Sequence, residues 1–230
     1  MNREIFFAAI RPDLFGGRLT QSQVEGIITI LDEWDRRRLT TLQHLAYMLA
    51  TVKHETAHTM QPIMERGPKK YFDRYEGRKD LGNTIKGDGY RFRGRGFVQI
   101  TGRANYNRAA KELGVDLVAS PERALDPTLA AAILFTGMQE GWFTGKKLSD
   151  YFDSGMTNWR EARRIINALD KADLIAGYGK RFFANLQFAS VVDLPSSSPS
   201  TPPVSLPQPP RYAWLTDLLR SLFKWKGNKP

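Results

Sequence analysis

The chain contains no cysteine, so disulfide bonds and thiolate metal ligands are both excluded. It also lacks an apolar run long enough for a signal peptide or a membrane span. The apolar segment at residues 5–10 is followed at once by Arg11, Pro12 and Asp13. The sequence therefore predicts synthesis in the cytoplasm without a signal peptide.

A change of composition divides the chain. Of the 230 residues, 41% are apolar, which is enough to bury one sizeable core. Proline and serine dominate from residue 194 onward, which is typical of a semi-rigid linker. We expect a catalytic domain at 1–190, a linker at 191–210 and a basic amphipathic helix at 211–230. That helix is too short and too charged to span a bilayer, and its composition suits an anionic membrane surface.

Positive charge is concentrated in one segment. Residues 66–111 contain 13 Lys or Arg against 4 Asp or Glu, a net charge of +9 out of +10 for the whole chain. Aromatic residues alternate with these cations, and such a segment attracts polyanions of any kind. Nucleic acid, an anionic cell-wall polymer and a membrane surface remain open on charge alone. A non-catalytic polyanion-binding module is thus one alternative function.

Helical patterns predominate outside residues 62–102. Helices are predicted at residues 4–11, 20–34, 42–58, 104–113, 126–138, 158–169 and 172–189. In the third of these, Glu55 falls at the flank of the apolar stripe, where partial desolvation can create a general acid. Residues 62–102 hold eight glycines, so long loops are expected there, with one short strand at 98–101.

Two catalytic interpretations compete for Glu55. Residues 54–58 satisfy the H-E-x-x-H pattern, which on a helix places His54 and His58 around zinc with Glu55 as base. The remaining histidine, His44, lies about 15 Å away along that helix, out of reach as a third ligand. Alternatively, Glu55 pairs with Glu65 as the two carboxylates of an inverting glycosidase, which stand about 6.5 to 9.5 Å apart. Glu76 is a second candidate for the base.

The order of the motifs resembles glycoside hydrolase family 19, which includes chitinases and lysozyme-like phage endolysins. The resemblance rests on residues 54–56, on Glu65, on residues 94–106 and on residues 164–167, and it covers roughly residues 40–187. It implies a mainly α, lysozyme-like α+β fold, in which a helical catalytic domain carries a small irregular or β lobe along the cleft.

The resemblance also implies roles for particular residues. Glu55 is the expected general acid, Glu65 the base that activates water, and Thr101 a residue that helps to hold this water. Substrate contacts are expected from His54, Gln99, Asn105, Tyr106, Arg164 and Asn167. No metal or cofactor is expected.

Departures from the chitinase pattern favour the endolysin branch. Ala57 and His58 stand where chitinases commonly have two glycines, and Ala168 follows Asn167 where they have glycine. The implied substrate is the peptidoglycan glycan strand, cut between N-acetylmuramic acid and N-acetylglucosamine, with chitin as the alternative. We expect a monomer without a nucleic-acid partner. It would be made in a host cytoplasm and reach the cell wall once the membrane is permeabilised.

Overall fold

Helices dominate the computed structural model, which describes residues 1–153 and 155–192. The α-helices are α1 (Arg3–Phe15), α2 (Gln21–Arg36), α3 (Leu42–Glu55), α4 (Asp88–Arg91), α5 (Arg103–Leu113), α6 (Pro127–Glu140) and α7 (Ala172–Val191). Short 3-10 helices are η1 (Lys69–Tyr75), η2 (Lys79–Leu81), η3 (Pro121–Leu125), η4 (Leu148–Asp150) and η5 (Glu161–Ile165). The predicted mainly α class is confirmed.

The strands form two small antiparallel sheets. β1 (Ile63–Met64) pairs with β2 (Arg95–Gly96), with Ile63 opposite Gly96. β3 (Phe152–Asp153) pairs with β4 (Met156–Thr157), with Phe152 opposite Thr157. The first sheet joins the end of the segment after α3 to the glycine-rich segment before α5.

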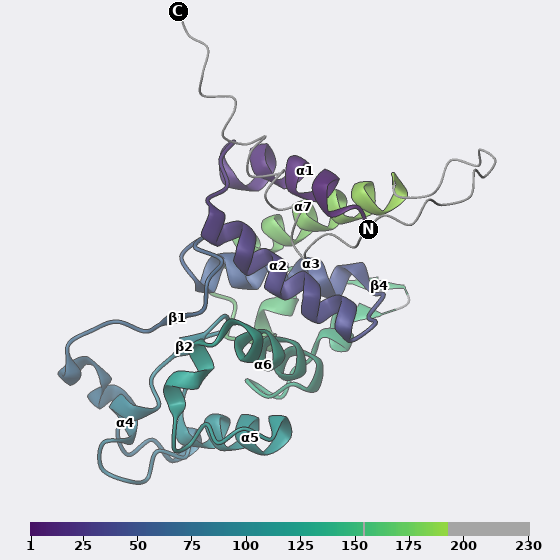
Figure 1. The fold of residues 1–230 in the computed structure, drawn as a ribbon. Helices are drawn as coiled ribbons and strands as arrows, with labels where there is room; N and C mark the ends of the chain where they lie inside the picture. Colours follow the sequence, from purple (N-terminus) through teal and green to yellow (C-terminus); the bar gives the residue numbers. More distant parts are fainter. Residues whose placement is uncertain (154, 193–230) are drawn as a thin grey trace, which may run out of the picture.

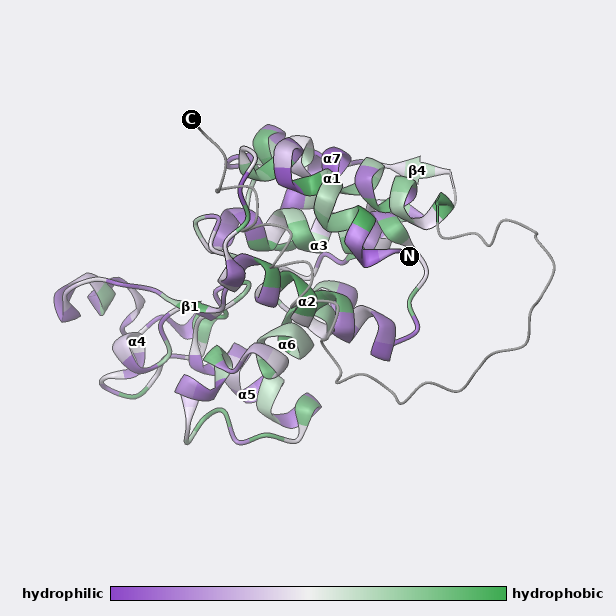
Figure 2. Ribbon diagram, turned by 45° about the horizontal axis from the view of Figure 1, so that its top comes forward, coloured by the Kyte–Doolittle hydropathy of each residue, from purple (hydrophilic) through white to green (hydrophobic). Residues whose placement is uncertain are grey.

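Helix α3 is the centre of the core. Every residue from Leu45 to Lys53 is at most 2% exposed, so the helix is buried on all sides rather than along one stripe. It packs along α7, where Gly179 leaves room for the ring of Trp159 beside Tyr47. Figures 1 and 2 show α1, α2, α3 and α7 gathered into one helical body. The end of α3 is thereby held rigidly.

Local capping signals place the ends of several helices as the sequence predicts. Thr20 and Gln23 form a capping box at the start of α2. Asp126 accepts a hydrogen bond from the Leu129 amide at the start of α6, and Gly114 ends α5 in the left-handed conformation. Each signal acts within four residues of the helix end, which is why sequence alone reveals it.

Three helix predictions are wrong. The helix expected at 42–58 ends at Glu55. Helix α1 was expected to end near Pro12, but it continues to Phe15, where the Phe15 ring packs against Phe182 of α7. The tertiary contact outweighs the backbone hydrogen bond that proline cannot donate. The expected helix at 158–169 is reduced to η5, although Asn158 does accept a hydrogen bond from the Glu161 amide.

The chain turns back along α2 after α3. The Gln23 side chain donates to the His58 carbonyl, and Gln61 donates to the Ser22 carbonyl. Gly26 permits this approach, because a Cβ there would lie 1.7 Å from the Met60 carbonyl oxygen. The turn leads the chain into β1, and so determines the position of Glu65, the residue that follows this strand.

The segment from β1 to α4 projects to one side of the helical body (Figures 1 and 2). Residues 98–101 were expected to form a strand, but Gln99 has a φ of 55° and only Ile100 bridges back to Arg95. This is a tight turn rather than a strand. The predicted alternation of burial is nevertheless present, since Val98 and Ile100 are buried while Gln99 and Thr101 are partly exposed.

The expected linker and amphipathic helix lie, beyond residue 192, outside the described residues. The expected domain boundary at 190 falls one residue before the end of α7. Among the described helices none is both long and apolar enough to cross a membrane.

Candidate active site

Glu55 is the last residue of α3, and its side chain is 17% exposed. Its Oε1 accepts a hydrogen bond of 2.5 Å from Nη1 of Arg163, which is itself only 4% exposed. Arg163 is held in turn by its Nε, which donates to the Asp170 carbonyl at 3.0 Å. The first carboxylate is therefore half of an ion pair at the border of the core, open to solvent at one edge.

Arg163, which pairs with Glu55, was not among the residues predicted for the site, whereas the adjacent Arg164 was. Arg164 was predicted as a substrate contact, but its side chain points to solvent and pairs with Glu161 at 2.7 Å. Consecutive residues of a 3-10 helix face directions about 120° apart, so η5 can bury only one of the two. Asn167 is also exposed, and its Oδ1 accepts a hydrogen bond from the Ala168 amide.

Glu65 follows β1 and is held by three donors. Its Oε1 accepts hydrogen bonds from Nη2 of Arg74 at 2.6 Å and from the Tyr75 hydroxyl at 3.0 Å. Its Oε2 accepts one from the Gly94 amide at 3.1 Å, and its own amide donates to the Gly94 carbonyl at 2.8 Å. Burial, together with the charge of Glu65, raises the pKa of Tyr75, which therefore remains a donor at neutral pH.

Gln99, predicted as a substrate contact, lies next to Glu65. A Cβ at Gly94 would be 2.9 Å from Gln99 Oε1 and 3.2 Å from Glu65 Oε2, so the bare glycine lets the two side chains meet. Gln99 Nε2 donates to the carbonyls of Ile63 and Gly96 at 2.9 and 3.0 Å. The amide thus ties β1 to β2 directly below the second carboxylate.

Thr101 and Asn105 are partly exposed and linked to the same turn. Thr101 Oγ1 donates to the Gln99 carbonyl at 2.8 Å, and Asn105 Nδ2 donates to the Thr101 carbonyl at 2.8 Å. The lone pairs of the Thr101 hydroxyl remain able to accept from a water molecule. Gln99, Thr101 and Asn105 are therefore joined by hydrogen bonds within one turn, on which the Gln99 side chain lies beside Glu65.

Tyr106 is a correction to the expected site. Its side chain is 0% exposed, and its hydroxyl accepts from Arg95 Nη1 at 2.9 Å and donates to the Arg93 carbonyl at 3.0 Å. Burial raises the pKa of Tyr106 to about 12. A side chain enclosed in this way supports the β2 turn from inside and does not touch a ligand.

No protein-family model matches the chain. A glycosyl hydrolase family 19 domain-containing protein of Haemophilus influenzae (strain ATCC 51907 / DSM 11121 / KW20 / Rd) is 44% identical over 54 residues, 23% of this chain and 27% of that protein. The match thus spans about a quarter of the length of this curated relative.

Solved structures extend the likeness to most of the chain. Chitinase C from Streptomyces griseus HUT6037 superposes with a TM-score of 0.53 at 18% identity, over 83% of this chain and 78% of that one. A bacterial family 19 chitinase superposes with a TM-score of 0.52 at 20% identity, over 79% of this chain and 92% of that one. The fold is that of family 19. The resemblance predicted from the motifs is confirmed.

The zinc interpretation loses its geometric basis in this family 19 fold. Helix α3 ends at Glu55, and Ala57 and His58 both have positive φ values, so His54 and His58 do not stand one turn apart on a helix. His58 instead packs its ring edge against Tyr178. Within 1–153 and 155–192 no three His, Asp or Glu side chains are grouped to hold a metal. Burial lowers the pKa of His54, so it is neutral at pH 7.

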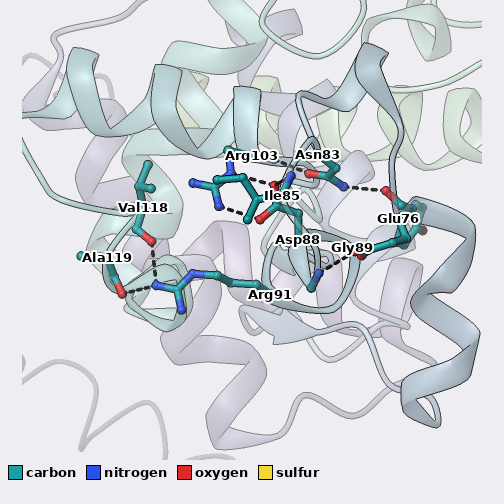
Figure 3. A network of polar contacts seen from close by, with 11 residues as sticks. Glu76, Asn83, Ile85, Asp88, Gly89, Arg91, Arg103, Val118 and Ala119 are labelled. Atoms are coloured by element: carbon teal, nitrogen blue, oxygen red, sulfur yellow. Dashed lines mark hydrogen bonds and ion pairs between the residues drawn. The ribbon is translucent and has the colours of Figure 1, made fainter.

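Glu76, the second candidate for the base, is part of the loop framework. Its carboxylate accepts hydrogen bonds from the amides of Gly87 and Gly89 at 2.5 and 2.9 Å. Figure 3 shows it beside the ion pair of buried Asp88 and partly exposed Arg103, which are joined at 2.6 Å. Both of its oxygens thus close the loop, and Glu76 stays the second candidate for the base.

Proposed function

We propose that this protein is an inverting glycoside hydrolase that cuts peptidoglycan between N-acetylmuramic acid and N-acetylglucosamine. The observation that carries the proposal is the pair of partly exposed carboxylates, Glu55 and Glu65, each joined to one arginine within a family 19 fold. An inverting mechanism uses two carboxyl groups about 6.5 to 9.5 Å apart, because a water molecule must fit between base and sugar.

In this mechanism Glu55 protonates the leaving oxygen. Once the proton has left, Arg163 stabilises the carboxylate that remains at a distance of 2.5 Å. The arginine therefore contributes more after proton donation than before it, which is the direction that assists bond cleavage.

Glu65 takes a proton from the attacking water on the opposite side of the sugar. The Gly94 amide and the Tyr75 hydroxyl hold its carboxylate in place. Thr101, whose hydroxyl donates to the Gln99 carbonyl, orients the same water. Gln99 and Asn105 then supply amide groups for the hydroxyl and acetamido substituents of the substrate.

Chitin is the second candidate substrate, because the solved structures named above are those of chitinases. Peptidoglycan is preferred for two reasons. The motif at 54–58 departs from the chitinase pattern, and residues 66–111 carry a net charge of +9, which suits an acidic cell-wall polymer.

Digestion of purified Gram-negative cell walls, with and without EDTA, tests the proposal. New reducing ends on muramic acid, unaffected by EDTA, would establish the muralytic glycosidase. Peptide fragments that disappear with EDTA would restore the zinc peptidase. Polymer binding without any cleavage would favour the polyanion-binding module.

The proposed biological role is that of a phage-type endolysin, which cuts the host cell wall during lysis. The protein would wait in a host cytoplasm as a monomer and reach the wall once the inner membrane is permeabilised. Residues 211–230, outside the described residues, would then engage an anionic membrane surface. Removing residues 194–230 should abolish binding to anionic vesicles, and undiminished binding would refute this role.

A further inference from the structure

The carboxylate of Glu65 is hydrogen-bonded to other residues of the same chain. Its Oε1, with the side chain 18% exposed, already receives two donors, the Arg74 guanidinium and the Tyr75 hydroxyl. A general base needs a free lone pair aimed at water, and an adjacent cation withdraws electron density from the carboxylate. In the described arrangement Oε1 is therefore not free to accept a proton from water.

Arg74 differs from the arginine that pairs with Glu55. The Arg74 side chain is 46% exposed, whereas that of Arg163 is 4% exposed. Exposed ion pairs are weak, because water competes for both partners. A carboxylate arriving from solvent can therefore displace Glu65 from Arg74, while the Arg163 pair is shielded from such exchange.

The surface around Arg74 has the charge and the exposed aromatic rings that suit binding of an anionic glycan. The Arg74 guanidinium stacks on the rings of Tyr71 at 3.7 Å and Tyr75 at 4.7 Å, which holds the cation in place while leaving its edge donors free to change partners. Tyr71 contacts Phe72, which contacts Tyr90, and Arg93 lies 4.0 Å from the centre of the Tyr90 ring. Tyr71 and Tyr90 are each 40% exposed. The result is an open aromatic face bearing positive charge beside the base.

We infer that Arg74 is a specificity-determining residue that exchanges partners: a carboxylate on the glycan takes Arg74 from Glu65 and thereby frees Oε1 to activate water. The inference rests on the proposed glycosidase function and deepens it. Tyr75 and Gly94 stay on Glu65 throughout, so the freed carboxylate keeps its orientation. Glycans that carry carboxylates, as muramic acid and its attached peptide do, switch the base on, and neutral chitin does not.

The test compares Arg74→Ala with the wild-type chain on three substrates: intact peptidoglycan, glycan strands stripped of peptide, and chitin oligosaccharides. On the acidic substrates, kcat/KM should fall about tenfold, the worth of one charged hydrogen bond. On chitin oligosaccharides, kcat should rise, because the cation no longer occupies Glu65. If stripped strands behave like intact peptidoglycan, the lactyl carboxylate is the trigger; if they behave like chitin, the peptide carboxylates are.

A matched control lies on the same segment. Arg78 is 48% exposed and pairs only with Asp80 among the described side chains, so Arg78→Ala removes an equally exposed cation away from Glu65 and should leave every rate unchanged. Arg74→Lys should retain part of the preference for acidic glycans, since it keeps the charge. Circular dichroism of each variant confirms folding.

The possible outcomes distinguish a failure of the Arg74 partner exchange from a failure of the proposed glycosidase function. A loss of activity by the same factor on all three substrates, or no gain on chitin oligosaccharides, would overturn the exchange and leave Arg74 as a residue that only orients Glu65. A wild-type chain that cleaves none of the three glycans would instead overturn the proposed function.

Discussion

Glu55 lies at the end of a helix that is buried on all sides, whereas Glu65 lies in an irregular, glycine-rich segment that projects from the helical body. The partner of Glu55 is a buried arginine from 108 residues further along the chain. Glu65 is bound to donors within 29 residues, one of them an exposed arginine. The acid is thus positioned by close packing and the base by loop hydrogen bonds, which leaves the base as the side that can respond to substrate.

The largest change in turnover is expected when each of the two carboxylates is replaced by an amide. Glu55→Gln should lower turnover by about 100- to 10,000-fold without disturbing the fold, because the shape is kept and the acid proton is lost. Glu65→Gln should cost less, since Thr101 can still orient water. Reducing-end assays on cell walls measure both. An equal or greater loss in Glu65→Gln would mean that the base contributes at least as much as the acid.

Removing the arginine partners should separate buried from exposed pairing. Arg163→Ala leaves Glu55 without its partner and should reduce the free energy of unfolding by about 3 kcal/mol, measured by denaturant titration. Its neighbour Arg164 is a matched control, because its side chain is exposed and pairs with Glu161 alone. Arg164→Ala should leave stability close to that of the wild type. Equal effects of the two substitutions would contradict the assignment of Arg163 to Glu55.

Substitution of two glycines, one in each region, should affect stability in one case and activity in the other. At Gly26 an added methyl would overlap the Met60 carbonyl, so Gly26→Ala should cost about 1 to 3 kcal/mol of stability. At Gly94 the methyl would meet the tips of Gln99 and Glu65, which are side chains that can move. Gly94→Ala should therefore lower activity with little change in thermal stability. A folded, fully active Gly94→Ala variant would show that the orientation of Glu65 tolerates displacement.

The smallest effect concerns a hydroxyl group on α3. Tyr47 is 0% exposed, and its hydroxyl has no hydrogen-bond partner among the described residues. Burial raises its pKa well above the ordinary value. Because an unpartnered polar group is unfavourable in the core, Tyr47→Phe should leave stability unchanged or raise it by up to about 1 kcal/mol in thermal unfolding. A clear loss of stability would reveal a partner for this hydroxyl.

The motifs predicted the fold better than the individual contacts. The mainly α class and the family 19 resemblance follow from residues 54–56, 94–106 and 164–167, and the comparisons confirm them. Gln99, expected from the same motifs to contact the substrate, lies beside Glu65. Tyr106 and Arg164 belong to the same motifs, yet one is buried and the other points to solvent. A motif records which residues accompany a fold, and does not state which of them face the ligand.

By itself, the sequence determined the local features of this protein. The capping box of Thr20 and Gln23, the cap at Asp126 and the left-handed Gly114 each complete their hydrogen bonds within four residues, so the information is present in the adjacent sequence. Tertiary structure alone decided where α3 ends, which of two consecutive arginines reaches Glu55, and that Arg74 occupies Glu65. Those outcomes depend on burial and on partners distant in the chain, which local sequence does not encode.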